Sequence, residues 1–120
     1  MRQPDVRRQL LDIDAGDGSL HFVLENIGCL PAHTVRVRFS RAVRDLAGLR
    51  VGDNPLYTQL GFLAPGRRLP LFVDTLTGYL QRRQPMCFDV RLAWCDDAGT
   101  PRRRTISHDL TAWTQLRTTL

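Results

Sequence analysis

LHFVLENIGCLPAHTVRVRF, residues Leu20 to Phe39, is the stretch that decides the fold. In each half of it, apolar side chains alternate with other side chains, which is the period of a half-buried β-strand. Between the halves lies a corner at Asn26-Ile27-Gly28, where Asn and Gly tolerate left-handed backbone, and Pro31 then interrupts any continuing ladder. The pattern predicts two strands joined by a corner. The expected core positions are Leu20, Phe22 and Leu24 in the first strand and Val35, Val37 and Phe39 in the second.

Length and composition place the chain among folded proteins of one domain. It has 120 residues, of which 42% are hydrophobic and 24% are charged, and it contains no internal repeat. We therefore expect a single domain over residues 1–120 that buries a core without metal or disulfide. No apolar run has the length of a signal peptide or of a membrane span, so a cytoplasmic location is expected.

The cysteines favour the same location. Three cysteines are an odd number for a disulfide framework, and the sequence has no CxxC. Cys87 and Cys95 fall in one predicted strand, about 26 Å apart at roughly 3.3 Å per residue, too far to bridge each other. Free thiols in a reducing compartment are the simpler interpretation.

The rest of the chain continues the strand pattern, with turn residues at short intervals. The segment from Ala42 to Leu60 is the least regular, and a short helical turn is one option for Arg41 to Ala47. Another helical turn is an option between Thr75 and Pro85, and residues 111–120 either extend the last strand or form a short helix. About seven short strands without long helical periodicity predict an all-β antiparallel sandwich, with a closed barrel as the competing architecture. The further expected strands are Val6 to Asp14 in a hairpin with the strand that begins at Ser19, His33 to Arg41, Leu60 to Leu63, Arg67 to Asp74 as an edge or bulged strand because of Pro70, Met86 to Asp96, and Arg102 to Leu110.

The motifs resemble a known family. The chain has FVLENIG at 22–28, PAHTVRV at 31–37, FLAPG at 62–66 and FDVRLAWCDDAG at 88–99. These segments are similar to the bacterial immunoglobulin-like β-sandwich domains of the CARDB type, over about Leu20 to Leu110. The resemblance implies an immunoglobulin-like sandwich of about seven strands with a binding or structural role. It departs from antibody-type domains, because apolar residues such as Phe22 and Val90 occupy the positions of the inter-sheet disulfide.

Patterns typical of catalysis or metal binding are missing from the sequence. His21, His33 and His108 have no metal-ligand spacing and do not converge by strand parity. Asp96 and Asp97 adjoin in a turn, where aspartates are usually turn formers. No nucleophile motif or glycine-rich phosphate loop is present. We therefore expect a protein that is not an enzyme and that uses no metal or other cofactor.

The arginines supply the one spatial hypothesis. The net charge is +5, and all 17 basic residues are arginine. In an immunoglobulin-like sandwich the third strand pairs with the strand from Met86, which pairs with the last strand, so their outward side chains share a face. A basic face of this kind binds an anionic partner, unless it is only a solvated sheet face with cross-strand charge pairs. The expected face comprises Arg36, Arg38, Arg91 and Arg103, with Arg82, Arg83, Arg102 and Arg104 as a possible extension.

The expected function is a non-enzymatic interaction or accessory module of a bacterial assembly. Its partner would be another protein, or a second copy joined through an edge strand. The alternative is an arginine-dependent binder of nucleic acid or another polyanion. Aromatic side chains for base stacking are scarce outside the core, and Tyr57 and Tyr79 are the loop candidates.

Overall fold

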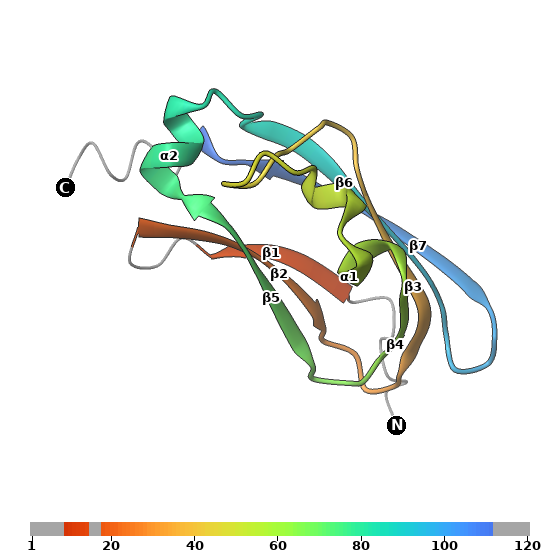
Figure 1. Cartoon of the computed structure of the whole chain (residues 1–120). Helices are drawn as coiled ribbons and strands as arrows, with labels where there is room; N and C mark the ends of the chain where they lie inside the picture. Colours follow the sequence, from red (N-terminus) through yellow and green to blue (C-terminus); the bar gives the residue numbers. More distant parts are fainter. Residues whose placement is uncertain (1–8, 15–17, 112–120) are drawn as a thin grey trace.

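The fold is built from two antiparallel sheets that enclose one apolar core. The computed structural model describes residues 9–14 and 18–111. The first sheet has the strand order β1-β2-β5, and the second sheet has the order β4-β3-β6-β7 (Figure 1). The strands are β1 (Gln9–Asp14), β2 (Ser19–Asn26), β3 (Ala32–Phe39), β4 (Leu60–Leu63), β5 (Arg68–Thr75), β6 (Cys87–Cys95) and β7 (Pro101–Asp109).

This topology confirms the all-β prediction. β1 and β2 form the expected hairpin, β3 pairs with β6, and β6 pairs with β7. Among the described strands β5 lies at the edge of the first sheet, as its Pro70 predicted, because proline has no amide hydrogen to donate to a further strand. The described strands form two separate sheets, so the closed-barrel alternative is wrong. The predictions for residues 6–8, 15–17 and 112–120 lie outside the described residues.

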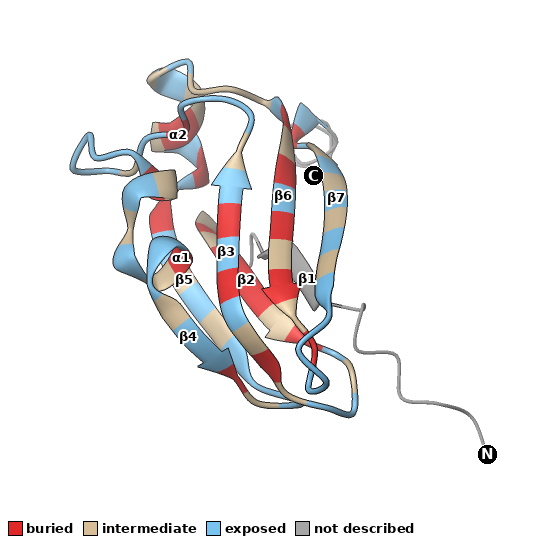
Figure 2. Ribbon diagram, turned by 90° about the vertical axis from the view of Figure 1, so that its right-hand side faces the viewer, coloured by how far each residue is buried: buried red, intermediate tan, exposed pale blue. Residues whose placement is uncertain are grey.

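Alternating side chains of both sheets make the core. Along β3 and β6, buried and exposed residues alternate, as Figure 2 shows for both strands. Each sheet thus turns one apolar face inward and one polar face to solvent. The buried side chains include Leu20, Phe22, Leu24, Val35, Val37, Val73, Phe88, Val90, Leu92 and Trp94, and Phe39 packs against them half-buried.

The segment between β3 and β4 differs from its prediction at Arg41 to Ala47, where no helical turn forms. The chain there makes a tight loop instead, in which Asp45 Oδ1 accepts a hydrogen bond of 2.9 Å from the Leu49 amide. Gly48 has φ +82°, a left-handed conformation that suits glycine, and this reverses the chain. An aspartate side chain that bonds the backbone in this way competes with helix formation.

Helical structure appears later in the same segment. A short 3-10 helix, η2 (Val51–Asp53), precedes the short α-helix α1 (Pro55–Thr58). Asn54 caps α1, since its Oδ1 accepts a hydrogen bond of 2.9 Å from the Leu56 amide. α1 lies against β3 where β4 no longer pairs with it, because the β3–β4 ladder ends at Val35 and Leu60.

The connection between β5 and β6 contains the helical turn that the sequence allowed. α2 (Leu76–Gln81) is capped by Thr75, whose Oγ1 accepts a hydrogen bond of 3.0 Å from the Gly78 amide. At the end of α2, Arg82 forms an ion pair with Asp74, a residue fully buried at the end of β5. This pair ties the C-terminal end of the helix to β5. In the described part of the chain, no helix is long and apolar enough to cross a membrane.

The corner after β2 is organised by a buried asparagine. Asn26 Nδ2 donates hydrogen bonds of 3.0 Å to the Leu30 carbonyl and 3.1 Å to the Leu63 carbonyl. Its Oδ1 accepts a third bond of 2.9 Å from the Gly28 amide. Since β2 belongs to the first sheet and Leu63 ends β4 of the second, one side chain joins the two sheets.

Candidate binding face and adjoining cavity

The four arginines predicted to share a face do lie on the same side of the second sheet. Arg38 is the register partner of Arg91, while Arg36 is opposite Ala93, whose other neighbour is Arg103. Each of the four is exposed, because strand parity turns it away from the core. Together they are called the arginine face below. They line a groove of about 370 Å³ with Leu92, Ala93, Arg104 and Thr105.

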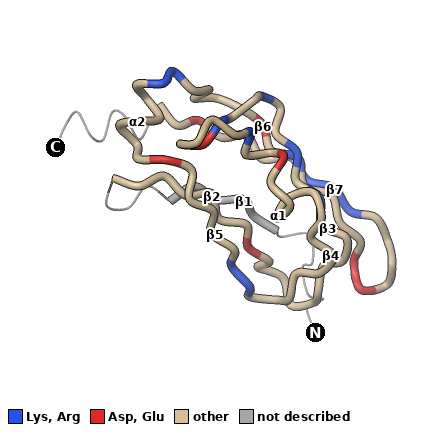
Figure 3. The backbone as a smooth tube through the Cα atoms, in the orientation of Figure 1, with Lys and Arg blue, Asp and Glu red and all other residues tan. Residues whose placement is uncertain are grey.

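The arginine face forms no ion pair with a carboxylate in the part of the chain that the structure describes. Two aspartates occur on the same side of the sheet: Asp89 accepts a hydrogen bond of 2.8 Å from Ser107, and Asp109 accepts one from Thr111. Within the described residues, no ion pair includes any of the four arginines. Figure 3 shows basic residues, in blue, along β7 on this side of the molecule.

The four arginines of the possible extension differ in their surroundings. Arg82 is engaged by the buried Asp74, and Arg102 Nε donates to Asp96 Oδ2 at 3.1 Å, so both have a structural role. Arg83 is exposed beyond α2, with φ +53°. Arg104 is half-buried on the inward parity of β7, although it still contributes to the groove. Sequence parity identified the four central arginines correctly, but it could not reveal which of the others had partners.

The β6–β7 turn explains why Asp96 is unavailable to the face. Asp96 Oδ1 accepts hydrogen bonds of 2.9 Å from the Thr100 amide and 3.0 Å from the Ala98 amide. The Thr100 bond is the largest of the effects, including the Arg102 contact, that lower the pKa of the Asp96 carboxyl. The carboxylate therefore acts as the turn former that the sequence predicted.

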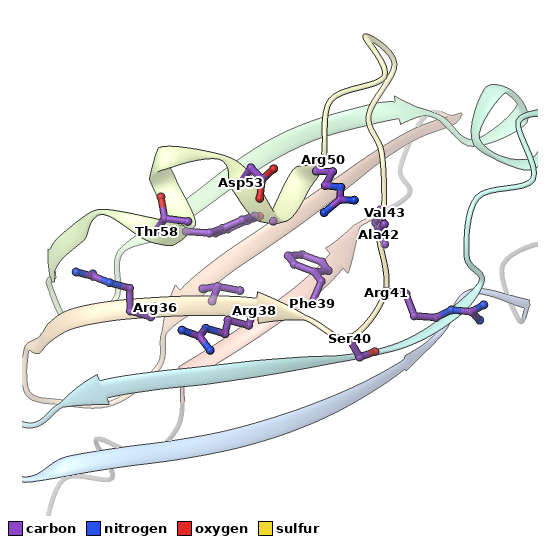
Figure 4. Close-up of a pocket in the computed structure, with 13 residues that line it drawn as sticks. Arg36, Arg38, Phe39, Ser40, Arg41, Ala42, Val43, Arg50, Asp53 and Thr58 are labelled. Carbon is purple, nitrogen blue, oxygen red and sulfur yellow. The ribbon is translucent and has the colours of Figure 1, made fainter.

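A cavity of about 600 Å³ adjoins the arginine face on the other side of β3. Arg36 and Arg38 line both the groove and this cavity, which also receives Arg41 and Arg50 from the irregular segment after β3. In Figure 4, Arg50 extends toward β3 from the segment above it, whereas Arg41 turns away along the ribbon. The apolar floor includes Val37 and Phe39. The other lining residues are Ser40, Ala42, Val43, Gly52, Asp53, Tyr57 and Thr58.

Sequence reasoning missed this cavity. Arg41 was predicted at the end of the third strand, but nothing marked it as lining a cavity. Arg50 lies in the least regular stretch, so nothing in the pattern placed it beside β3. The basic character of RAVRDLAGLR at 41–50 was the one available signal. Tyr57, predicted as an exposed loop aromatic, is instead fully buried against Phe39, with ring centroids 5.7 Å apart.

Tyr79, the second loop candidate, also lies in the core. Tyr79 is fully buried on α2, and its hydroxyl donates a hydrogen bond to the Pro85 carbonyl. Burial raises the pKa of Tyr79 well above its usual value, as it does for Tyr57. The two loop candidates for base stacking are therefore both in the core, where their rings are not free to stack on bases.

The histidines and cysteines do not come together as a metal-binding group among the described residues. His33 Nε2 lies 3.2 Å from Asp97 Oδ1, and its register partner Cys95 makes no hydrogen bond with it. Cys29, Cys87 and Cys95 are free thiols, as predicted. Among the described residues, no group of three His, Cys, Asp or Glu side chains could hold a metal ion.

Comparison with known proteins gives a family but no named relative. No curated protein and no solved structure matches the chain. A family model described as "Domain of unknown function (DUF8453)" matches residues 1–114, which is nearly the whole chain. The two sheets, the arginine face and the cavity all lie within the matched residues. The chain therefore belongs to the DUF8453 family.

Proposed function

We propose that the protein is a single immunoglobulin-like β-sandwich that acts as a non-enzymatic interaction module and binds an acidic protein surface through the arginine face. The observation that carries the proposal is the convergence of Arg36, Arg38, Arg91 and Arg103 without a carboxylate partner among the described residues. Like charges held side by side destabilise a sheet. A partner's carboxylates would remove this repulsion on binding, which favours complex formation.

The immunoglobulin-like assignment is part of this proposal. It is supported by the split of the described strands into sheets of three and four. It is supported also by the β3-β6-β7 order, which corresponds to the pairing of the third strand with the two C-terminal strands in such domains. The family description names no function, so the role of the domain rests on the face.

An acidic protein surface fits the face better than nucleic acid does. The groove over the face has no aromatic lining residue, and the chain has no described helix of a length suited to the major groove. Phe62, 52% exposed on β4, packs edge-on against His33 at the end of the same sheet and does not line the groove. Binding of nucleic acid by stacking would need aromatics among the arginines.

The test measures binding to poly-L-glutamate and to single- and double-stranded DNA at low and moderate salt. Poly-L-glutamate is expected to bind at low salt and to weaken as salt is added, because the attraction between exposed charges is screened. Replacing Arg36, Arg38 and Arg91 together with Gln should abolish this binding. Arg67→Gln removes one charge from the exposed connection between β4 and β5 and is the control, which should bind almost as well as the natural protein.

The outcomes separate the two candidate partners. Binding of DNA without binding of poly-L-glutamate would replace the proposal by the polyanion alternative. Absence of binding to either polymer at low salt would overturn both.

A further inference from the structure

The cavity beside β3 has features that the arginine face alone does not explain. Three of its guanidinium groups, those of Arg38, Arg41 and Arg50, make no ion pair or hydrogen bond among the described residues. Of these, Arg50 extends toward β3 on the side where Phe39 lies (Figure 4). Arg36, by contrast, donates to the Val35 carbonyl at 2.9 Å. The one acidic residue in the lining is Asp53. The cavity is therefore left with excess positive charge.

The cavity lining also includes a buried hydroxyl group without a hydrogen-bond partner among the described residues. Tyr57 lines the cavity and is fully buried, and its Oη has no hydrogen-bond partner in the described structure. A buried polar group without a partner is unfavourable, so such groups are rare and call for an explanation. Burial raises the pKa of Tyr57, which keeps the hydroxyl protonated and able to donate.

Apolar surface lies next to these donors. Val37 and Phe39 of β3 and Val43 of the following loop line the same cavity. Its volume of about 600 Å³ falls within the range of small-molecule sites, which are typically ~300–1,000 Å³. An occupant that matches this lining has an anionic group and an apolar group in one molecule.

From these contacts the geometry points to a binding site for an organic anion, in which Arg50 binds a phosphate or carboxylate group, Tyr57 donates a hydrogen bond, and Val37, Phe39 and Val43 contact an apolar group. The anion is either a free small molecule or an acidic side chain of a bound protein. The site adjoins the arginine face but does not depend on the proposed function, because Arg50 lines only the cavity and Arg103 lines only the groove.

The experiment titrates the protein with phenyl phosphate and follows backbone amide signals by NMR. Inorganic phosphate, which lacks the apolar group, and phenol, which lacks the charge, are the matched probes. We expect phenyl phosphate to bind more tightly than either and to shift the signals of Val43 and Gly52. Shifts confined to residues outside the cavity, or phenol binding as tightly as phenyl phosphate, would overturn the site.

Two single variants separate the cavity from the arginine face. Arg50→Gln should weaken phenyl phosphate binding roughly tenfold, as loss of a charge-assisted bond does, while Arg103→Gln should change it less than about twofold. Equal weakening by both would show that only the overall charge matters and would overturn the site. Loss of poly-L-glutamate binding in Arg103→Gln, with phenyl phosphate still bound, supports both proposals as separate sites. Phenyl phosphate binding without any poly-L-glutamate binding supports the cavity and rejects the proposed function.

Two further readouts complete the test. Tyr57→Phe keeps the buried ring and removes the hydroxyl, so the fold should persist while binding weakens; unchanged binding would overturn the role of Tyr57 as donor. Poly-L-glutamate binding to Arg50→Gln distinguishes the two sources of the anion. Its weakening indicates that a partner's acidic side chain enters the cavity, and its retention indicates a free small molecule; both results are compatible with the site.

Discussion

Arg38 and Arg91 are direct register partners across the β3–β6 ladder, with their side chains on the same exposed face. Two like charges opposite each other in neighbouring strands lower the stability of a sheet. The second sheet thus keeps an unfavourable pair at the centre of the arginine face. Such a conflict between stability and surface charge is typical of binding sites.

Replacing Arg91 with Gln should therefore stabilise the protein while it weakens binding to poly-L-glutamate. The expected gain in the free energy of unfolding is about 0.2–1 kcal/mol, measured by urea denaturation at low salt, and it should shrink as salt is added. Arg67→Gln serves again as the control of equal charge change. A loss of stability in Arg91→Gln would contradict the repulsion between Arg38 and Arg91.

Loss of an arginine charge should have the opposite effect on stability at the buried ion pair between Arg82 and Asp74. Arg82→Gln leaves the Asp74 carboxylate buried without its partner, and we expect the free energy of unfolding to fall by about 3 kcal/mol. The neighbouring Arg83 is exposed, so Arg83→Gln is a matched control that should change stability by less than about 0.5 kcal/mol. Urea denaturation of the two variants compares them directly, and similar losses would rule out a special role for the pair.

Gly78 gives a separate test of the packing around this pair. A Cβ atom at Gly78 would lie 2.8 Å from Asp74 Oδ1 and 2.9 Å from Thr75 Oγ1. Gly78→Ala should consequently lower the melting temperature, even though alanine is the better helix former. Gly61, where an added Cβ would meet no atom within 4 Å, provides the comparison, and Gly61→Ala should be far milder. A Gly78→Ala protein as stable as the natural one would show that the Asp74 side chain can move aside.

Cys87 should react more slowly with alkylating reagents than its exposure suggests. Its thiol donates to Asp109 Oδ1 at 3.5 Å, and this bond is the largest effect that raises the pKa of Cys87. A raised pKa means less of the nucleophilic thiolate at a given pH. Asp109→Asn removes the negative charge, so alkylation of Cys87 near pH 8 should accelerate. Mass spectrometry can follow Cys87 and Cys29 in the same sample, and an unchanged ratio of their rates would contradict the effect of Asp109.

The regular parts of the molecule were the ones that sequence could predict. Period-two alternation assigned Arg36, Arg38, Arg91 and Arg103 to one face, because side-chain direction in a strand follows from position alone. The irregular segment after β3 has no such rule. Arg50 approaches β3 only because Gly48 reverses the chain and α1 takes the place of a longer β4.

The sequence also could not show which arginines form ion pairs, because this depends on tertiary packing. Arg82 and Arg83 look equivalent in QRRQ, yet one binds Asp74 and the other faces solvent. The difference depends on where α2 ends relative to β5, which is a matter of tertiary packing. Tyr57 likewise lies in a stretch without a clear period but is buried, and its ring packs against Phe39.

The hydrogen bonds of Asn26 have a consequence for how the protein unfolds. The Asn26 amide reaches the Leu63 carbonyl across 37 positions in the chain, and so connects the end of a strand in one sheet to the end of a strand in the other. Neither sheet can open at this corner without breaking bonds that hold its neighbour. The two sheets should therefore lose their structure together in a single cooperative transition. With alanine at position 26, that coupling would be weakened at the point where the chain first passes from one sheet to the other.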